Sequence, residues 1–229
     1  MILYYNNPIT PAKKGCFILA GKASNKIITD GAKFLFAVII ACLLLSQVVP
    51  VWASEENSYI ENSQLLILAG GIFMVVYAAQ NPLLEKRQIK LLYLSVPVWL
   101  IMIGREVSWG RTLIIDPGTG DFISRSNLWY WPLVYPLLAV TIIVTLYSMY
   151  KAGILKEVSF WFANRKTLAI PVCILLLSVT GLTVFEKNII KNVSGRNQVY
   201  EELSEVVMYF SLLAICWDLY IAPYRDKSK

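Results

Sequence analysis

The stretch Phe34–Ala53 reads FLFAVIIACLLLSQVVPVWA and contains no charged residue. A helix needs roughly 20 residues to cross a hydrocarbon core about 30 Å thick, so this stretch is long enough to span a membrane. Five more apolar stretches follow it, and they are Gln64–Ala79, Leu91–Gly104, Trp129–Tyr150, Leu168–Phe185 and Val206–Ile221. The sequence therefore predicts an all-α integral membrane protein, a bundle of about six transmembrane helices.

The composition of the whole chain agrees with a membrane protein. Of the 229 residues, 57% are hydrophobic and 16% are charged, whereas about a quarter of the residues in a water-soluble domain are charged. Six spans use about half of the chain and leave no room for a separate soluble domain. We expect a transmembrane domain at residues 33–224, after a cytoplasmic amino-terminal segment at residues 1–32 and before a short cytoplasmic tail at residues 225–229.

Charged residues alternate between the segments that flank the apolar stretches. Fifteen of the 21 Lys and Arg residues lie before the first stretch, between the second and third, between the fourth and fifth, or after the sixth. The other three segments hold ten of the 15 Asp and Glu residues. Basic residues concentrate on the cytoplasmic face of membrane proteins, so this alternation predicts that both termini lie inside. It also explains the formal charge of +6 by topology and anionic lipid, and we expect no nucleic-acid partner.

The amino-terminal part leaves two questions open. Part of Cys16–Gly31 either lies on the membrane surface or belongs to a loosely ordered tail. The first apolar stretch is either a retained span or a signal peptide, because Val51-Trp52-Ala53 resembles a cleavage site. The long polar segment before it is atypical of a signal peptide and favours a retained span. We therefore expect a multi-pass protein of the plasma membrane, which in a bacterium is the inner membrane.

Two of the apolar stretches are short and border charged residues. Leu91–Gly104 is followed directly by Arg105 and Glu106, and Val206–Ile221 is preceded by Glu205. Short spans draw their flanking residues toward the hydrocarbon boundary. We therefore expect these three charges to lie at the same outer depth.

Helix periodicity indicates which of the side chains at this depth can meet. We expect the third helix to continue through Trp109 and to stop at Gly110. On the last helix, Glu202, Glu205 and Tyr209 fall on one face. A charge at this depth is costly unless it is paired or faces water. We therefore expect charged side chains of the third helix to form ion pairs with those of the last helix.

The predicted cluster lies at the outer ends of the third and last helices. One of two arginines, Arg105 or Arg111, pairs with a carboxylate of the last helix. That carboxylate is Glu202 or Glu205, and Glu106 lies nearby. The full set of candidate residues is Arg105, Glu106, Ser108, Trp109, Arg111, Glu202, Glu205 and Tyr209.

Each candidate residue also has an ordinary structural explanation. The arginines can reach headgroup phosphates without a protein partner, and the glutamates can form a solvated first turn that the helix dipole favours. Trp109 is typical of an aromatic belt at the interface. Asp218 projects from the opposite side of the last helix, near its inner end, and is either a second functional residue or a solvated one.

The residue types narrow the possible chemistry. The chain has no histidine, which excludes Ser-His and Cys-His nucleophiles. It also has no CxxC, Walker A or dinucleotide-binding motif, so we expect no cofactor and no bound metal. General acid–base catalysis by Glu106 or Glu205 is the enzymatic route that remains. The alternative for these carboxylates is a Mg²⁺ or Ca²⁺ ion, because both ions prefer oxygen ligands.

The segment Gly104–Arg111 reads GREVSWGR and resembles a Glu-x-Ser-Trp-Gly motif of uncharacterised bacterial polytopic membrane proteins. The acid-rich segment Tyr200–Glu205, at the start of the last helix, is similar to the segment that accompanies this motif. The resemblance implies a helical membrane protein and implies no activity. Ceramidase-like membrane hydrolases also place acids and serines at helix ends, but they bind zinc through histidines that this chain lacks.

Three functions from different classes fit these observations. In the first, the outer cluster binds a lipid headgroup, a small ligand or a partner protein, so that the partners are membrane lipids and another membrane protein. In the second, the chain is a small-solute or ion transporter or channel, with Asp218 and the outer carboxylates at the two ends of a route. In the third, it is a histidine-independent membrane enzyme acting on a lipid-linked substrate. We favour the first because it requires the fewest assumptions.

Overall fold

The structure, a computed structural model, describes most of the chain. The described ranges are residues 29–54, 58–82, 84–164, 168–187, 189 and 195–221. Side chains are described in all of these ranges except at residues 160–164. The expectations for the segment before residue 29 and for the tail at residues 225–229 lie outside the described residues.

Helices dominate the described ranges. The long helices are α2 (Asp30–Val48), α3 (Tyr59–Ala79), α4 (Lys86–Glu106), α5 (Trp131–Lys151), α7 (Ala169–Glu186) and α8 (Asn197–Tyr220). The shorter ones are α6 (Ile154–Asn164) and the 3-10 helices η3 (Val51–Ser54), η4 (Ser108–Leu113) and η5 (Arg125–Asn127). Within the described ranges, six helices are long and apolar enough to cross a membrane. This confirms the prediction of an all-α protein with six candidate spans.

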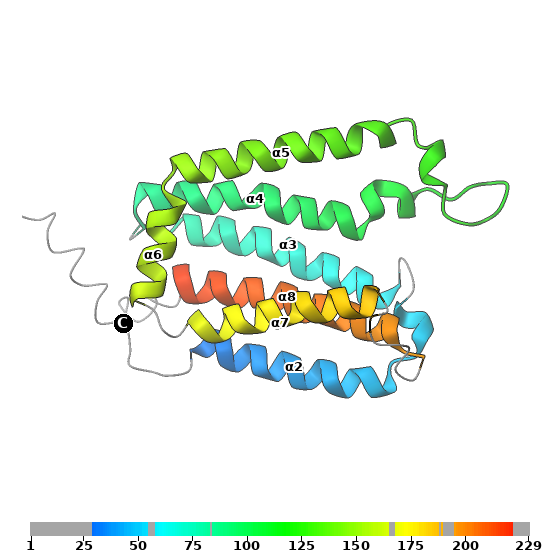
Figure 1. The fold of residues 1–229 in the computed structure, drawn as a ribbon, viewed down its shortest axis with the longest axis horizontal. Coiled ribbons are helices and arrows are strands. Elements are labelled where there is room, and N and C mark those ends of the chain that lie inside the picture. The colour runs from blue at the N-terminus through cyan, green and yellow to red at the C-terminus, as the bar shows by residue number, and fades with distance from the viewer. Residues whose placement is uncertain are drawn as a thin grey trace, which may run out of the picture.

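The six long helices lie side by side and run alternately in opposite directions (Figure 1). Helix α8 is central and packs against α7, α2 and α3. Helix α4 packs on α3, and α5 packs on α4 at the edge of the bundle. The short helix α6 lies across one end of the bundle (Figure 1). We call that end the α6 end, and we call the opposite end, where α4 finishes and α3 and α8 begin, the loop end.

A close contact fixes helix α4 against helix α3. Trp99 of α4 is buried with its ring against Gly71 of α3, where a Cβ atom would lie 2.3 Å from a ring carbon. Lipid is as apolar as the helices themselves, so close packing through small residues, rather than the hydrophobic effect, holds transmembrane helices together. The α3–α4 contact therefore sets how the polar ends of these two helices face each other.

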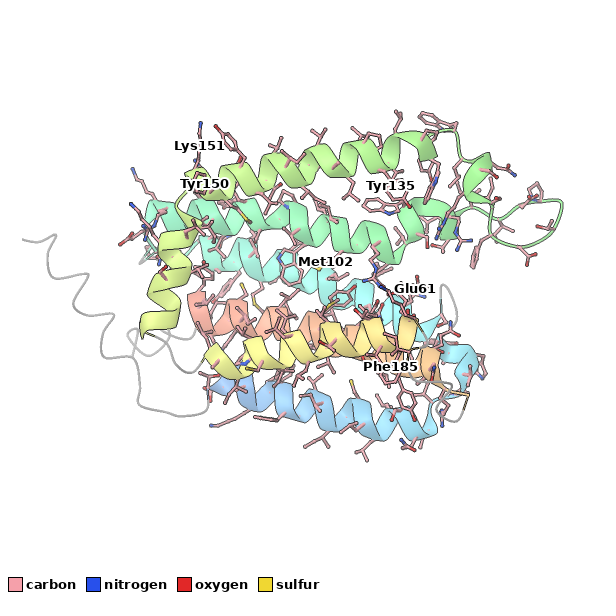
Figure 2. The ribbon with its side chains drawn as sticks, in the orientation of Figure 1. Glu61, Met102, Tyr135, Tyr150, Lys151 and Phe185 are labelled. Atoms are coloured by element: carbon pink, nitrogen blue, oxygen red, sulfur yellow. The ribbon has the colours of Figure 1, made fainter. Side chains whose placement is uncertain are left out.

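Charged residues separate between the two ends of the bundle. The described basic residues of the segments predicted to be cytoplasmic lie at the α6 end, and they are Lys33, Lys86, Arg87, Lys90, Lys151 and Lys156. Figure 2 shows Lys151 at this end and Glu61 at the loop end. The fold therefore brings together the segments that the charge pattern grouped.

The end of helix α4 differs from the prediction. The sequence predicts a helix that continues through Trp109, whereas α4 ends at Glu106. Ser108 and Trp109 have positive φ angles of 45° and 56°, a region that residues other than glycine rarely occupy, and the chain turns there into η4. Helices α4 and α8 also extend beyond their apolar stretches, to 21 and 24 residues. Neither helix is therefore too short for a hydrocarbon core.

Candidate functional site

The candidate site lies at the loop end, where three helices meet. Helix α4 brings its last turn there, and α3 and α8 bring turns near their amino ends. We call the residues that meet at this point the polar cluster, and they are Gln64, Arg105, Glu106, Glu202, Glu205 and Tyr209.

Arg105 connects the two helices that the sequence analysis paired. Its Nη2 donates a hydrogen bond to Oε1 of Glu205, and its Nη1 lies 4.0 Å from Oε1 of Glu106. The Arg105 side chain is 49% exposed, whereas the Glu205 side chain is 4% exposed. The guanidinium therefore forms the outer edge of the cluster, and the carboxylates lie behind it.

Glu106 is held by a neutral donor as well as by Arg105. The hydroxyl of Tyr209 donates to Oε1 of Glu106 at 2.5 Å. Glu106 is 5% exposed and Tyr209 is completely buried. Because a tyrosine hydroxyl carries no charge, this bond orients the Glu106 carboxylate without cancelling its charge.

Gln64 of helix α3 is a member of the cluster that the sequence analysis did not identify. Its side chain is completely buried, and its Nε2 donates to Oε2 of Glu202 at 2.8 Å and to the Glu202 carbonyl at 3.1 Å. Its other polar atom, Oε1, has no hydrogen-bond partner among the described residues. A buried acceptor without a donor is uncommon and costs about 1–3 kcal/mol.

One sequence signal for Gln64 is visible in retrospect. Gln64 shares a spacing of three or four residues with Leu68, Gly71 and Val75, and all four are buried. A polar residue in the buried stripe of an apolar helix is expected to have a polar partner on a neighbouring helix. The buried polar position of Gln64 was therefore predictable from this spacing, although its partner was not.

The cluster contains more negative than positive charge. It has three carboxylates and one guanidinium: Glu106 and Glu205 pair with Arg105, and Glu202 accepts from the neutral amide of Gln64. Glu61, one turn before Gln64, lies at the same end of the bundle (Figure 2). Burying a charge is costly unless an opposite charge or a proton compensates it. The excess negative charge of the cluster therefore requires compensation, either by bound protons or by a cationic group.

The structure places three of the predicted site residues in the turn after α4. Ser108 and Trp109 follow the end of the helix, and the Trp109 ring folds back over Gly104, where a Cβ atom would lie 2.5 Å from a ring carbon. The guanidinium carbon of Arg111 lies 5.9 Å from the centre of the Phe122 ring. Arg105, rather than Arg111, is thus the arginine that pairs with Glu205.

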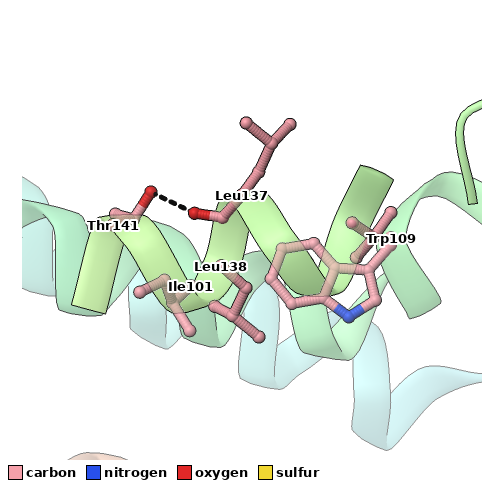
Figure 3. A pocket seen from close by; sticks show the side chains of 6 residues that line it. Ile101, Trp109, Leu137, Leu138 and Thr141 are labelled. Carbon is pink, nitrogen blue, oxygen red and sulfur yellow. Dashed lines mark hydrogen bonds between the residues drawn. The ribbon is translucent and has the colours of Figure 1, made fainter. Parts of the chain in front are cut away.

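Trp109 closes one end of an apolar recess between helices α4 and α5 (Figure 3). The recess has a volume of about 210 Å³ and is lined by Ile101, Trp109, Val134, Leu137, Leu138 and Thr141. The Thr141 hydroxyl donates to the Leu137 carbonyl at 2.8 Å, as Figure 3 shows. Because this hydroxyl is satisfied within its own helix, the recess presents an apolar surface.

Asp218 lies at the opposite end of the bundle from the polar cluster. Its Oδ2 accepts a hydrogen bond from the Thr29 hydroxyl at 2.6 Å, and Thr29 also accepts from the Ala32 amide as the N-cap of α2. A Cβ atom at Gly31 would lie 2.7 Å from the Asp218 carboxylate. A carboxylate so close to the first turn of a helix is favoured by the helix dipole, so Asp218 anchors the start of α2 to α8.

The described residues include no group of three or more His, Cys, Asp or Glu side chains arranged to hold a metal ion. The oxygen atoms of the polar cluster are instead arranged around hydrogen-bond donors, namely the hydroxyl of Tyr209, the amide of Gln64 and the guanidinium of Arg105. Comparisons of this chain with protein-family models, with curated proteins and with solved structures find no match.

Proposed function

We propose that this chain is a multi-pass plasma-membrane protein that binds a ligand with a primary ammonium group at its polar cluster, on the extracytoplasmic side. Three features support the proposal: the apolar surface of the bundle, the separation of charge between its ends, and the excess of carboxylates in the cluster. The excess of carboxylates is the observation on which the proposed ligand depends.

The surface of the bundle supports insertion in a membrane. Helix α5 exposes large apolar side chains around most of its circumference, and among its residues Thr145 alone is buried. Such a helix is unfavourable in water, because each exposed aliphatic side chain forgoes roughly 1.5–3 kcal/mol of burial energy. In a bilayer the same side chains contact lipid.

The separation of charge supports the orientation. The basic residues at the α6 end match the cytoplasmic side under the positive-inside rule. Figure 2 shows Lys151 at that end and Glu61 at the other. The polar cluster then faces the outside of the cell.

The donors and acceptors of the cluster support the choice of ligand. Carboxylates accept hydrogen bonds only, and the unsatisfied Oε1 of Gln64 is also an acceptor. A primary ammonium group carries three N–H donors and one positive charge. It can therefore donate a hydrogen bond to Oε1 of Gln64 and neutralise part of the negative charge of Glu106 and Glu202.

Thermal unfolding of the purified protein in detergent tests this proposal, with tryptophan fluorescence as the readout. We expect ethanolamine to raise the Tm in a saturable way, because a ligand that binds only the folded state stabilises it, by about 2.7 kcal/mol at a hundredfold excess over Kd. Choline, which has the same charge but no N–H donor, and sodium chloride at equal ionic strength serve as ligand controls.

Two variants give the matched protein controls. Glu202→Gln is expected to remove most of the ethanolamine effect. Asp121→Asn, which removes one charge from an exposed loop residue, is expected to keep the effect intact. Equal Tm shifts from ethanolamine and choline, or equal shifts in both variants, would contradict the proposal.

The two other functions have less support from the geometry. Asp218 is engaged in anchoring α2 to α8, which weakens its assignment to a transport route. The enzyme alternative keeps one supporting observation, because Glu106 and Glu205 both contact Arg105 and so lie close together. Two neighbouring carboxylates are a common arrangement for acid–base work.

A further inference from the structure

We propose that the ammonium group belongs to an aminophospholipid, one acyl chain of which lies in the recess between α4 and α5. This inference rests on the proposed function of the polar cluster and names the class of its ligand.

The size and lining of the recess fit part of an acyl chain. Its volume of about 210 Å³ is smaller than the roughly 300–1,000 Å³ of pockets that enclose a whole small molecule. The residues that line it from α5 follow one another at helical spacing along a single face, and they are Val134, Leu137, Leu138 and Thr141. An apolar recess between two candidate membrane-spanning helices is accessible to lipid chains.

The recess and the polar cluster share helix α4. Ile101 lines the recess, and Arg105 follows it by four residues, so the two side chains are about one turn apart on the same face of α4, with Cβ atoms about 5–6 Å apart. The Arg105 side chain therefore begins about one turn beyond the wall of the recess, and its half-exposed guanidinium extends to Glu205 of α8. A molecule with its chain in the recess places its headgroup at Arg105.

The charges at this point follow the order of charges in an aminophospholipid headgroup. The phosphate lies next to the acyl chains, and the ammonium group lies beyond it. Arg105 has five N–H donors and uses one of them for Glu205, so others can bind a phosphate. The Glu106 carboxylate lies beside Arg105, Glu202 lies one turn before Glu205 on α8, and both complement the ammonium group.

Aromatic residues place this arrangement at headgroup depth. The Tyr130 hydroxyl donates to the Trp109 carbonyl at 3.0 Å, and the Arg125 guanidinium carbon lies 5.2 Å from the centre of the Trp131 ring. Tryptophan and tyrosine side chains concentrate at the boundary between headgroups and hydrocarbon. The cluster then lies at the level of the headgroups, and the recess lies in the hydrocarbon just below.

Native mass spectrometry of the full-length protein, mixed with lipids that share the same acyl chains, tests the inference. The lipids are phosphatidylethanolamine, phosphatidylcholine, which has no N–H donor, and phosphatidylglycerol, which has no ammonium group. We expect phosphatidylethanolamine to bind roughly tenfold more tightly than either, the size expected for one charge-assisted hydrogen bond. Val134→Phe, which fills the recess, should lower its binding, whereas Val140→Phe, the same change at an exposed site of α5, should not.

The outcomes separate this inference from the proposed function. If phosphatidylethanolamine and phosphatidylcholine bind equally while free ethanolamine still raises the Tm, the lipid assignment is wrong and the ammonium site stands. If Val134→Phe and Val140→Phe retain lipid equally, the recess is not the chain site and the inference is overturned. Val134→Phe should keep the ethanolamine effect on the Tm, which shows that it folds with an intact cluster.

Discussion

The two ends of the bundle each hold buried carboxylates next to an arginine, but their charges balance differently. At the α6 end, Glu157 is 1% exposed and accepts from Arg87 at 2.7 Å and from Gln88 at 2.8 Å. In this network one buried carboxylate meets one guanidinium and one amide, whereas Asp218, at the same end, is a separate buried carboxylate held by Thr29. The second carboxylate near Arg87, Glu85 at 3.9 Å, is 53% exposed and is stabilised by solvent.

The loop end has no such balance. Two carboxylates, Glu106 and Glu205, share the guanidinium of Arg105. The third, Glu202, accepts from the neutral amide of Gln64, and Oε1 of Gln64 has no donor within the described residues. A balanced network holds elements together, and at the α6 end it joins α6 to the start of α4. An unbalanced one with the same residue types is expected to bind something that restores the balance. In our proposal, charge balance, rather than residue type, separates the structural network at Glu157 from the proposed binding site at the polar cluster.

The largest expected effect comes from breaking the balanced network. Arg87→Ala leaves the Glu157 carboxylate buried without its cation, and we expect a loss of about 3 kcal/mol in the free energy of unfolding. Unfolding by a denaturing detergent measures this loss, with Arg125→Ala as the control for removing an arginine from an exposed position. A loss no larger than that of the control would show that Glu157 does not depend on Arg87.

A smaller effect is expected from the cation of the polar cluster. Arg105→Gln should lower the free energy of unfolding by about 2 kcal/mol, less than Arg87→Ala because half of the Arg105 side chain is exposed. The same variant should bind ethanolamine more tightly, because the negative excess grows. Combining Arg105→Glu with Glu205→Arg should recover part of the lost stability, and independent, additive effects of the two changes would argue against the pair.

Neutralising one carboxylate at each end should change stability in opposite directions. Glu106→Gln relieves repulsion within the polar cluster, and we expect a gain of about 1 kcal/mol without ligand. Glu157→Gln removes the charge that pairs with Arg87 and should destabilise the protein. The same unfolding assay compares the two variants. A loss of stability in both would show that the polar cluster is no less balanced in charge than the Glu157 network.

The smallest effect on stability is expected at Gln64. Gln64→Leu removes a hydrogen bond to Glu202 together with the unsatisfied Oε1, so the free energy of unfolding should change by less than about 1 kcal/mol. Ethanolamine binding should nevertheless weaken by about tenfold, because the ligand loses an acceptor. Gln47→Leu, at an exposed position of α2, is the matched control, and equal binding by both variants would exclude Gln64 from the site.

Much of the architecture was predictable from the sequence because a bilayer imposes simple requirements. The apolar stretches identified the six long helices, and the alternation of charges grouped the segments that the fold collects at one end. Opposite charge at the ends of two apolar stretches predicted a pair between Arg105 or Arg111 and Glu202 or Glu205, and the fold selects Arg105 and Glu205. These are properties of single segments and their order, which a sequence records directly.

Other features depend on contacts that no single segment records. The left-handed turn at Trp109 arises where its ring packs over Gly104, and the hydrogen bond from Thr29, the N-cap of α2, to Asp218 depends on how α2 and α8 meet. The partners of Gln64 and Glu157 depend on packing between helices distant in the sequence. Amphipathic spacing can identify such residues as buried and polar, but it does not identify their partners.

Calorimetric titration of the purified protein with ethanolamine tests the central claim most directly, alongside the variant Glu106→Gln/Glu202→Gln. If the excess of carboxylates in the polar cluster binds a cation, the unchanged protein shows one saturable binding event per chain and the variant shows none. Absence of binding to the unchanged protein, or binding of equal strength to the variant, would contradict it.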